Sequence, residues 1–200
     1  MARPTLWLAP LLAVILIGAI RAPWSSVATV DERTYLEMSL GIRTSGLPLV
    51  DNGPVDRFAP LQARWNLYRH DRLWGTMSPG LAYLAAGLVD DDGIRAVVRL
   101  NIALLALLAV AIYATGSALT GDRDIGIASA YVGLLSIPVW TSSFGLLPYS
   151  LAITGFAWSL YCGARAQETG KRHWAAAAGL LAGLATTCQL LIFPLLCGLA

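Results

Sequence analysis

Charged side chains are scarce in this sequence of 200 residues. Asp, Glu, Lys and Arg make up 13% of the chain, hydrophobic residues make up 56%, and the mean hydropathy is +0.62. Because a soluble domain carries roughly 25% charged residues, this composition is typical of a membrane protein. The net charge of +2 and the lack of a dense Lys/Arg tract argue against a nucleic-acid partner.

Metal-ligand and nucleophile patterns are also missing. Cys162, Cys188 and Cys197 lie in apolar runs without a C-x-x-C pair, which argues against a disulfide framework or a zinc site. We interpret them as small packing residues. His70 and His173 are far apart, so they indicate no metal cluster. Neither an ATPase nor a hydrolase is indicated, because the sequence has no phosphate-binding glycine loop, nucleophile elbow or H-E-x-x-H motif.

Long apolar segments predict about five transmembrane helices within a single membrane domain. A helix needs about 20 mostly apolar residues to cross the hydrocarbon core. Residues 125–164 carry no charge and would form one helix about 60 Å long, twice the roughly 30 Å core. We therefore divide them into two spans that turn near Gly145 and Pro148. The predicted spans are residues 4–21, 95–120, 124–141, 146–164 and 174–200.

The remaining long segment, residues 22–94, is predicted to lie on one side of the membrane. Residues 4–21 could instead be a signal peptide, but Arg21 and Pro23 make a poor cleavage site. Within the long loop, helices are expected near residues 31–44 and 79–89, and the second is too short to cross. The expected fold class is an all-α integral membrane protein with juxtamembrane helices in a long outward loop.

Basic residues predict the orientation. With five spans, the short loops that carry Arg123, Arg165 and Lys171 fall on the side of the amino terminus and its Arg3, and that side should be cytoplasmic. Loops longer than about 60 residues count little in this rule. We therefore expect a multi-pass protein of the plasma (inner) membrane, with membrane lipids around its spans. Residues 22–94 should lie on the outer side.

The first part of the outward loop has the pattern of a short helix lying on the membrane. Tyr35, Met38 and Ile42 fall on one helical face, and Gly46 provides a stop. Asp31 and Glu32 would be in its first turn.

Asp31 and Glu32 have two interpretations. They can be ordinary first-turn acids that the helix dipole stabilises. Alternatively, a carboxylate near the lipid interface with arginines close by can act as a general base on an incoming hydroxyl. Because adjacent residues point to different sides of a helix, one base with a supporting acid fits better than a matched pair. Two acids could also hold a divalent cation.

A second cluster combines basic and aromatic residues in the segment "RWNLYRHDRLWGTMSPG". Arg64, Arg69, His70 and Arg72 are candidates for holding a lipid phosphate at the headgroup level. The alternative is a solvated loop that anchors the chain at the interface.

The order of these features resembles the amino-terminal part of the C-type membrane glycosyltransferases, the GT-C fold. The likeness is to the protein-mannosyltransferase and aminoarabinose-transferase-like family, which uses polyprenyl-phosphate sugars. After a first span, the matching segments are "DERTYLEMSLGI", "SGLPLV", "SPGLAYLAAGLV" and "RAVVRLNIALLALLAVAIYATGSALTG". The chain ends at Ala200 inside an apolar run, so we expect it to be the front part of a longer protein.

The resemblance implies an enzyme. The family's acid at this place is taken as the base that activates the acceptor, which maps onto Asp31, with Glu32 beside it. The implied reaction is inverting transfer, in which an acceptor hydroxyl attacks the anomeric carbon and the lipid phosphate leaves. The lipid-linked sugar donor and an unidentified hydroxyl acceptor are then the partners, and no further cofactor is assigned.

The chain departs from the family pattern at one element. The family's usual H-P-P or K-P-P before the surface helix is Ser-Pro-Gly at residues 78–80 here, so the basic residue is missing. By the resemblance, Arg69, His70 or Arg72 would have to make the phosphate contact instead.

The competing hypothesis is a non-catalytic multi-span protein, such as a transporter, a flippase or an assembly subunit. Transporters place ionisable groups at the middle of the bilayer. The polar residues within the predicted spans are uncharged, which weighs against ion-coupled transport. They are Asn101, Thr154, Thr186, Thr187 and Gln189.

Overall fold

The computed structural model describes residues 7–21, 30–50, 66–69, 72–75, 77–89, 95–135 and 148–189. Within these ranges the chain is predominantly helical, with one two-stranded hairpin. The helices are α1 (Leu8–Arg21), α2 (Val30–Ser45), α3 (Gly80–Ala86), α4 (Arg95–Thr120), α5 (Arg123–Leu134), α7 (Tyr149–Thr169) and α8 (Arg172–Cys188). The strands are β1 (Asn66–Arg69) and β2 (Arg72–Gly75).

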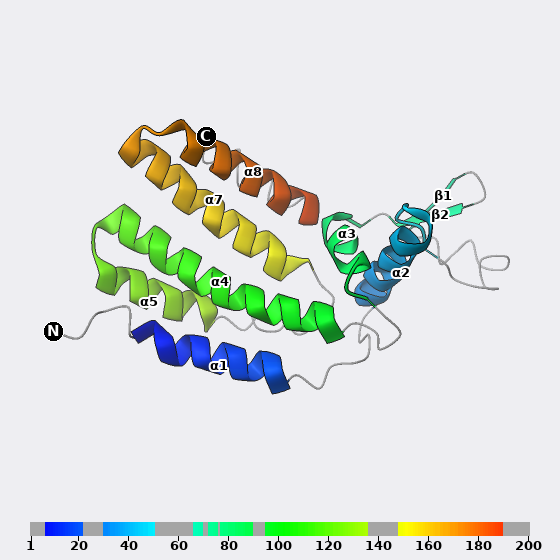
Figure 1. Cartoon of the computed structure of the whole chain (residues 1–200), viewed down its shortest axis with the longest axis horizontal. Helices are drawn as coiled ribbons and strands as arrows, with labels where there is room; N and C mark the ends of the chain where they lie inside the picture. The colour runs from blue at the N-terminus through cyan, green and yellow to red at the C-terminus, as the bar shows by residue number, and fades with distance from the viewer. Residues whose placement is uncertain are drawn as a thin grey trace.

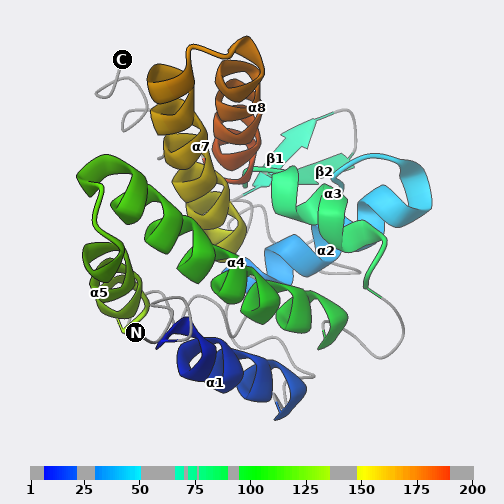
Figure 2. The same ribbon diagram turned by 60° about the vertical axis from the view of Figure 1, so that its left-hand side comes forward.

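Helices α1, α4, α5, α7 and α8 form a bundle, and the other described elements form a cap at one of its ends (Figure 1). In the bundle, α4 packs against α1, α5 and α7, and α7 packs against α8. The cap consists of α2, α3 and the β1–β2 hairpin; α3 contacts both α2 and α8, and β2 contacts α2. The second view keeps the cap elements together on one side of the bundle (Figure 2). The described elements between the first and second predicted spans therefore lie together at one end of the bundle.

Helix α4 is the central element of the bundle. Its 26 residues extend over about 39 Å at 1.5 Å per residue. Its apolar face is buried against three neighbours and includes Val97, Ile102, Leu105 and Leu108. In the described ranges α4 is the one helix long and apolar enough to cross a membrane, and α1 adds a shorter apolar stretch over Leu8–Ile17.

The other predicted spans overlap helices only in part. In the described part of residues 125–164, α5 ends at Leu134 and α7 begins at Tyr149. Pro148 precedes α7, whereas the turn expected near Gly145 lies outside the described residues. Five spans thus remain a prediction.

Small residues and hydroxyl groups mediate the closest helix contacts in the bundle. The Cα of Gly126 on α5 lies 3.1 Å from where a Cβ on Gly116 of α4 would be. Between α4 and α7, the Thr154 hydroxyl donates to the Leu104 carbonyl at 3.2 Å. Between α7 and α8, the Ser159 hydroxyl donates to the Ala178 carbonyl at 3.0 Å. Close helix packing through small and hydroxyl side chains is characteristic of membrane helices.

The expected all-α class holds for the described chain apart from one short hairpin. β1 and β2 pair antiparallel, and Arg69 and Arg72 are Cα partners beside the two-residue connection. Leu67 pairs with Trp74, and Tyr68 pairs with Leu73. Aromatic and large apolar cross-strand pairs favour a sheet, and pairing satisfies backbone groups that a single extended strand would leave open. Hydropathy averaged over the length of a transmembrane helix does not detect strands of four residues.

Candidate functional site

The acid pair lies in the first turn of α2, and Arg43 lies in its last turn. Both placements are favourable because the helix dipole is positive at the amino end and negative at the carboxyl end. Asp31 is exposed, whereas Glu32 is only 4% exposed. The two carboxylates therefore face different surroundings, as adjacent positions on a helix should.

The predicted apolar face of α2 is confirmed. Tyr35 and Met38 are buried, and Ile42 is partly buried against the same core. The helix ends where Gly46 adopts φ +76°, a left-handed conformation that glycine tolerates without strain. The Gly46 amide donates to the Ile42 carbonyl at 2.8 Å. Burying this face leaves Asp31 exposed in the first turn.

Tyr35 is a buried residue of α2 whose phenol lies within electrostatic range of residues at the ends of two bundle helices. Burial raises the pKa of its phenol well above the usual value, and the nearby Tyr149, Asp31 and Cys188 act in the same direction. Tyr149 is the first residue of α7 and Cys188 is the last residue of α8. At neutral pH the phenol is therefore a protonated donor between Asp31 and the bundle.

Helix α3 connects the cap to α8 through a backbone contact. A Cβ on Gly80 would lie 2.8 Å from both the Thr187 carbonyl oxygen and the Cys188 Sγ, so only glycine fits there without a shift. Within the cap, the Arg43 guanidinium donates to the Val89 carbonyl at 2.5 Å and so joins the end of α2 to the chain after α3. These contacts join α2 to α3 and α3 to the end of α8.

Two of the four proposed phosphate-binding residues, Arg69 and Arg72, fall on the hairpin. Arg69 and Arg72 lie at its turn, and β2 contacts α2, so their backbone belongs to the same cap as the acid pair. Arg64 and His70 lie outside the described residues. A contact between these basic side chains and a lipid phosphate stays a prediction.

Sequence reasoning missed three residues near this site. Tyr149 and Ser150 open α7, and Cys188 closes α8; Ser150 and Cys188 are buried. The sequence places them inside or at the edge of apolar runs, where they are typical of packing residues. Pro148 before Tyr149 was the available signal, because a proline often precedes or opens a helix and so marks an end of the bundle.

No group of three or more His, Cys, Asp and Glu side chains in the described ranges is arranged to hold a metal ion. A divalent cation at Asp31 would take its other ligands from water or from substrate phosphate, as magnesium commonly does. Comparison with protein-family models, with curated proteins and with solved structures gives no match to this chain. The function must therefore be argued from the site itself.

Proposed function

We propose that the chain is a membrane glycosyltransferase, or the amino-terminal part of one, that transfers a sugar from a polyprenyl-phosphate donor to a hydroxyl acceptor on the outer face. The observation that carries this proposal is the setting of Asp31. Its carboxylate is exposed at the start of α2, next to the buried Glu32 and Tyr35, where the cap meets one end of an apolar bundle. A lipid-linked sugar would present its anomeric carbon at this level.

In the proposed reaction, the Asp31 carboxylate takes the proton of the acceptor hydroxyl. The hydroxyl oxygen attacks the anomeric carbon and forms the new glycosidic bond. The bond from that carbon to the phosphate oxygen breaks, and the polyprenyl phosphate leaves with the electron pair. Attack from the face opposite the leaving group inverts the anomeric configuration. General-base catalysis of this kind contributes roughly 10²–10⁴-fold to a rate.

Two neighbours would position the base rather than react. Glu32 is buried on the inner side of α2. Tyr35 is one helical turn beyond Asp31, and its phenol stays protonated because burial raises its pKa. A neutral phenol can donate a hydrogen bond to a carboxylate or to a phosphate oxygen. The basic hairpin residues Arg69 and Arg72 would approach the leaving phosphate.

The outer surface of the bundle supports an environment of lipid. Large apolar side chains are exposed on four of its helices, whereas soluble monomers seldom present extended apolar surfaces. These side chains are Val14, Ile17 and Ile20 on α1, Leu107 on α4, Val132 on α5, and Leu180 and Leu184 on α8. We therefore propose that the bundle is embedded in the bilayer, with the cap at the outer surface.

The bundle interior favours an enzyme over an ion-coupled transporter. The hydroxyls of Thr154, Ser159 and Thr115 donate to backbone carbonyls of neighbouring helices, so they join helices to one another. Ion pathways instead use ionisable groups within the membrane. The described buried polar side chains of the bundle helices are uncharged.

A transfer assay tests the proposal. Membranes from cells that express the chain are incubated with radiolabelled polyprenyl-phosphate hexose or pentose, and label transferred to their endogenous glycolipid acceptors is counted against membranes without the chain. We expect Asp31→Asn to lower the rate by at least about 100-fold, and Glu32→Gln to lower it less, because Glu32 does not touch the acceptor.

The matched control for this assay is Asp124→Asn. Asp124 is also exposed in the first turn of a helix, but it lies at the opposite end of the bundle. The control should transfer at the wild-type rate. Wild-type activity in Asp31→Asn would contradict the assigned base. No transfer from any tested donor by the wild-type chain would contradict the glycosyltransferase.

A further inference from the structure

A groove far from the cap lies between α4, α5 and α7. It has a volume of about 250 Å³ and is open to the outside. From Ile112 to Leu119 it follows α4 for about 10 Å, and it is closed by Ser129 of α5 and by Ala157 and Leu160 of α7. It presents no polar surface. Pockets for compact ligands measure roughly 300–1,000 Å³ and include polar groups, so this groove fits a slender hydrocarbon chain.

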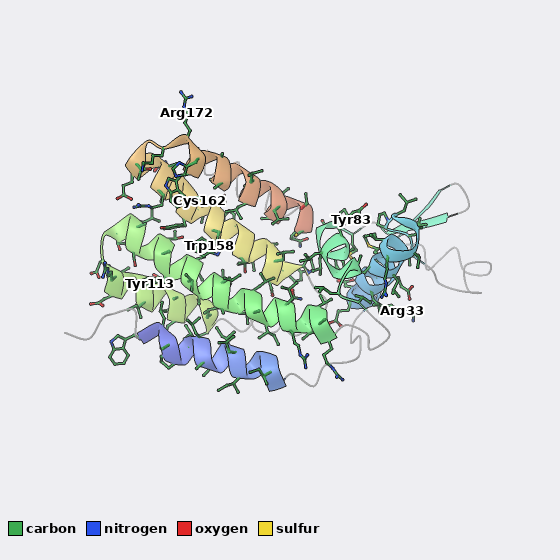
Figure 3. All side chains as sticks on the ribbon, viewed as in Figure 1. Arg33, Tyr83, Tyr113, Trp158, Cys162 and Arg172 are labelled. Carbon is green, nitrogen blue, oxygen red and sulfur yellow. The ribbon has the colours of Figure 1, made fainter. Side chains whose placement is uncertain are left out.

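Exposed cations lie beyond one end of the groove, at the turn from α7 to α8. Arg165 follows Leu160 by about 8 Å along α7, and it pairs with Glu168. Lys171 and Arg172 are exposed, and within the described residues neither has an ion-pair partner. Arg172 projects away from the bundle, at the end opposite to Arg33 of the cap (Figure 3). This turn therefore presents unneutralised positive charge.

Aromatic side chains lie at and near the α7–α8 turn, as is typical of a segment at the level of the lipid headgroups. The rings of Trp158 and Tyr161 meet edge to face with centroids 5.6 Å apart, and Tyr161 meets Trp174 in the same way at 6.0 Å. Trp174 stands beside His173 in the first turn of α8. Trp and Tyr gather where hydrocarbon meets headgroups, and Trp174, two residues after Arg172, lies at the depth of the exposed cations.

The α4–α5 turn does not share this positive character. Asp122 and Asp124 flank Arg123 there, and the Asp122 carboxylate accepts from the Asp124 amide as the cap of α5. An anionic group drawn to this end of the bundle would therefore settle on the α7–α8 side.

We infer that this end of the molecule binds one anionic phospholipid of the surrounding bilayer. One acyl chain lies in the groove between α4, α5 and α7, and the phosphate contacts Lys171 and Arg172 at the α7–α8 turn. The charge of the turn selects an anionic headgroup, and the apolar lining selects the chain. The inference rests on the proposal that the bundle is embedded in the bilayer. It concerns the end of the molecule opposite to Asp31.

The test measures lipid retention on the purified chain by native mass spectrometry after exchange into mixed micelles. The probes are phosphatidylglycerol and phosphatidylcholine with identical acyl chains. We expect phosphatidylglycerol to be retained preferentially. In Lys171→Gln/Arg172→Gln its affinity should fall about 25-fold, since each juxtamembrane cation contributes about fivefold. Leu119→Trp, which fills the groove from a side chain that is 69% exposed, should lower retention of both lipids.

The matched control for charge is Arg95→Gln/Arg99→Gln, which removes two exposed arginines at the other end of α4. It should leave the preference unchanged. Equal loss in the control, or an unchanged preference in Lys171→Gln/Arg172→Gln, would overturn the inference. Flotation of the chain with vesicles separates the two proposals. Failure to float contradicts the membrane embedding itself, whereas flotation without a phosphatidylglycerol preference contradicts only the lipid site.

Discussion

A Cβ atom on Gly80 would lie 2.8 Å from the carbonyl oxygen of Thr187 and 2.9 Å from its carbonyl carbon. The first residue of α3 and the last turn of α8 thus touch backbone to backbone, with Cys188 Sγ at the same distance as the oxygen. The cap helix α3 in turn packs against α2. The Gly80 contact is therefore a direct structural link between the cap that carries Asp31 and the bundle.

Gly80→Ala should destabilise the fold. Real Cβ atoms essentially never approach a heavy atom within 3.0 Å, so α3 must move away from α8. We expect the free energy of unfolding to fall by about 1–3 kcal/mol, the usual result of overpacking, measured by denaturant titration in detergent. Gly87→Ala is the control, because a Cβ at Gly87 meets nothing within 4 Å. Equal stability of the two variants would contradict the close contact.

Gly126→Ala should separate α5 from α4. The added Cβ would lie 2.1 Å from the Ser117 Oγ and 2.7 Å from the Tyr113 carbonyl oxygen. Rotating Ser117 relieves the first clash but not the second, which involves backbone. A loss of about 1–3 kcal/mol is expected, and Ser117→Ala in the same chain should restore only part of it. Gly163→Ala on α7, where the space is open, should be neutral or slightly stabilising.

Tyr35 should make stability depend on alkaline pH. Its pKa in the folded chain is raised, chiefly by burial, above the value of 10.0 expected when unfolded. Its contribution is therefore fully present below about pH 10, and it is lost as pH rises further because the unfolded chain releases this proton first. Between pH 9 and pH 11 the free energy of unfolding should fall less steeply in Tyr35→Phe than in the wild type.

The control for this titration is Tyr83→Phe, because the Tyr83 side chain is 52% exposed. That variant should follow the wild-type pH dependence. Parallel curves for Tyr35→Phe and the wild type would mean that the Tyr35 phenol ionises in the folded chain as it does in solution.

The sequence predicted the local features of α2 well. Asp31 and Glu32 were expected in its first turn, Tyr35 and Met38 on its buried face, and Gly46 at its end. These features depend on neighbours within a few residues, and a helical period makes such neighbours visible in a sequence. The hairpin at residues 66–75 was missed, because its strands are four residues long and are stabilised by cross-strand pairing.

The amino-acid sequence by itself determined the apolar character of the chain, the helical segments and the acids that open α2. Only the tertiary structure decided that Gly80 packs against Thr187 and Cys188, distant along the chain, and that Asp31 stays exposed while Glu32 is buried. The physical reason is that hydropathy and helical period are local properties of the chain. Which helix ends meet depends instead on close packing at positions such as Gly80, and packing is settled only when the whole bundle is assembled.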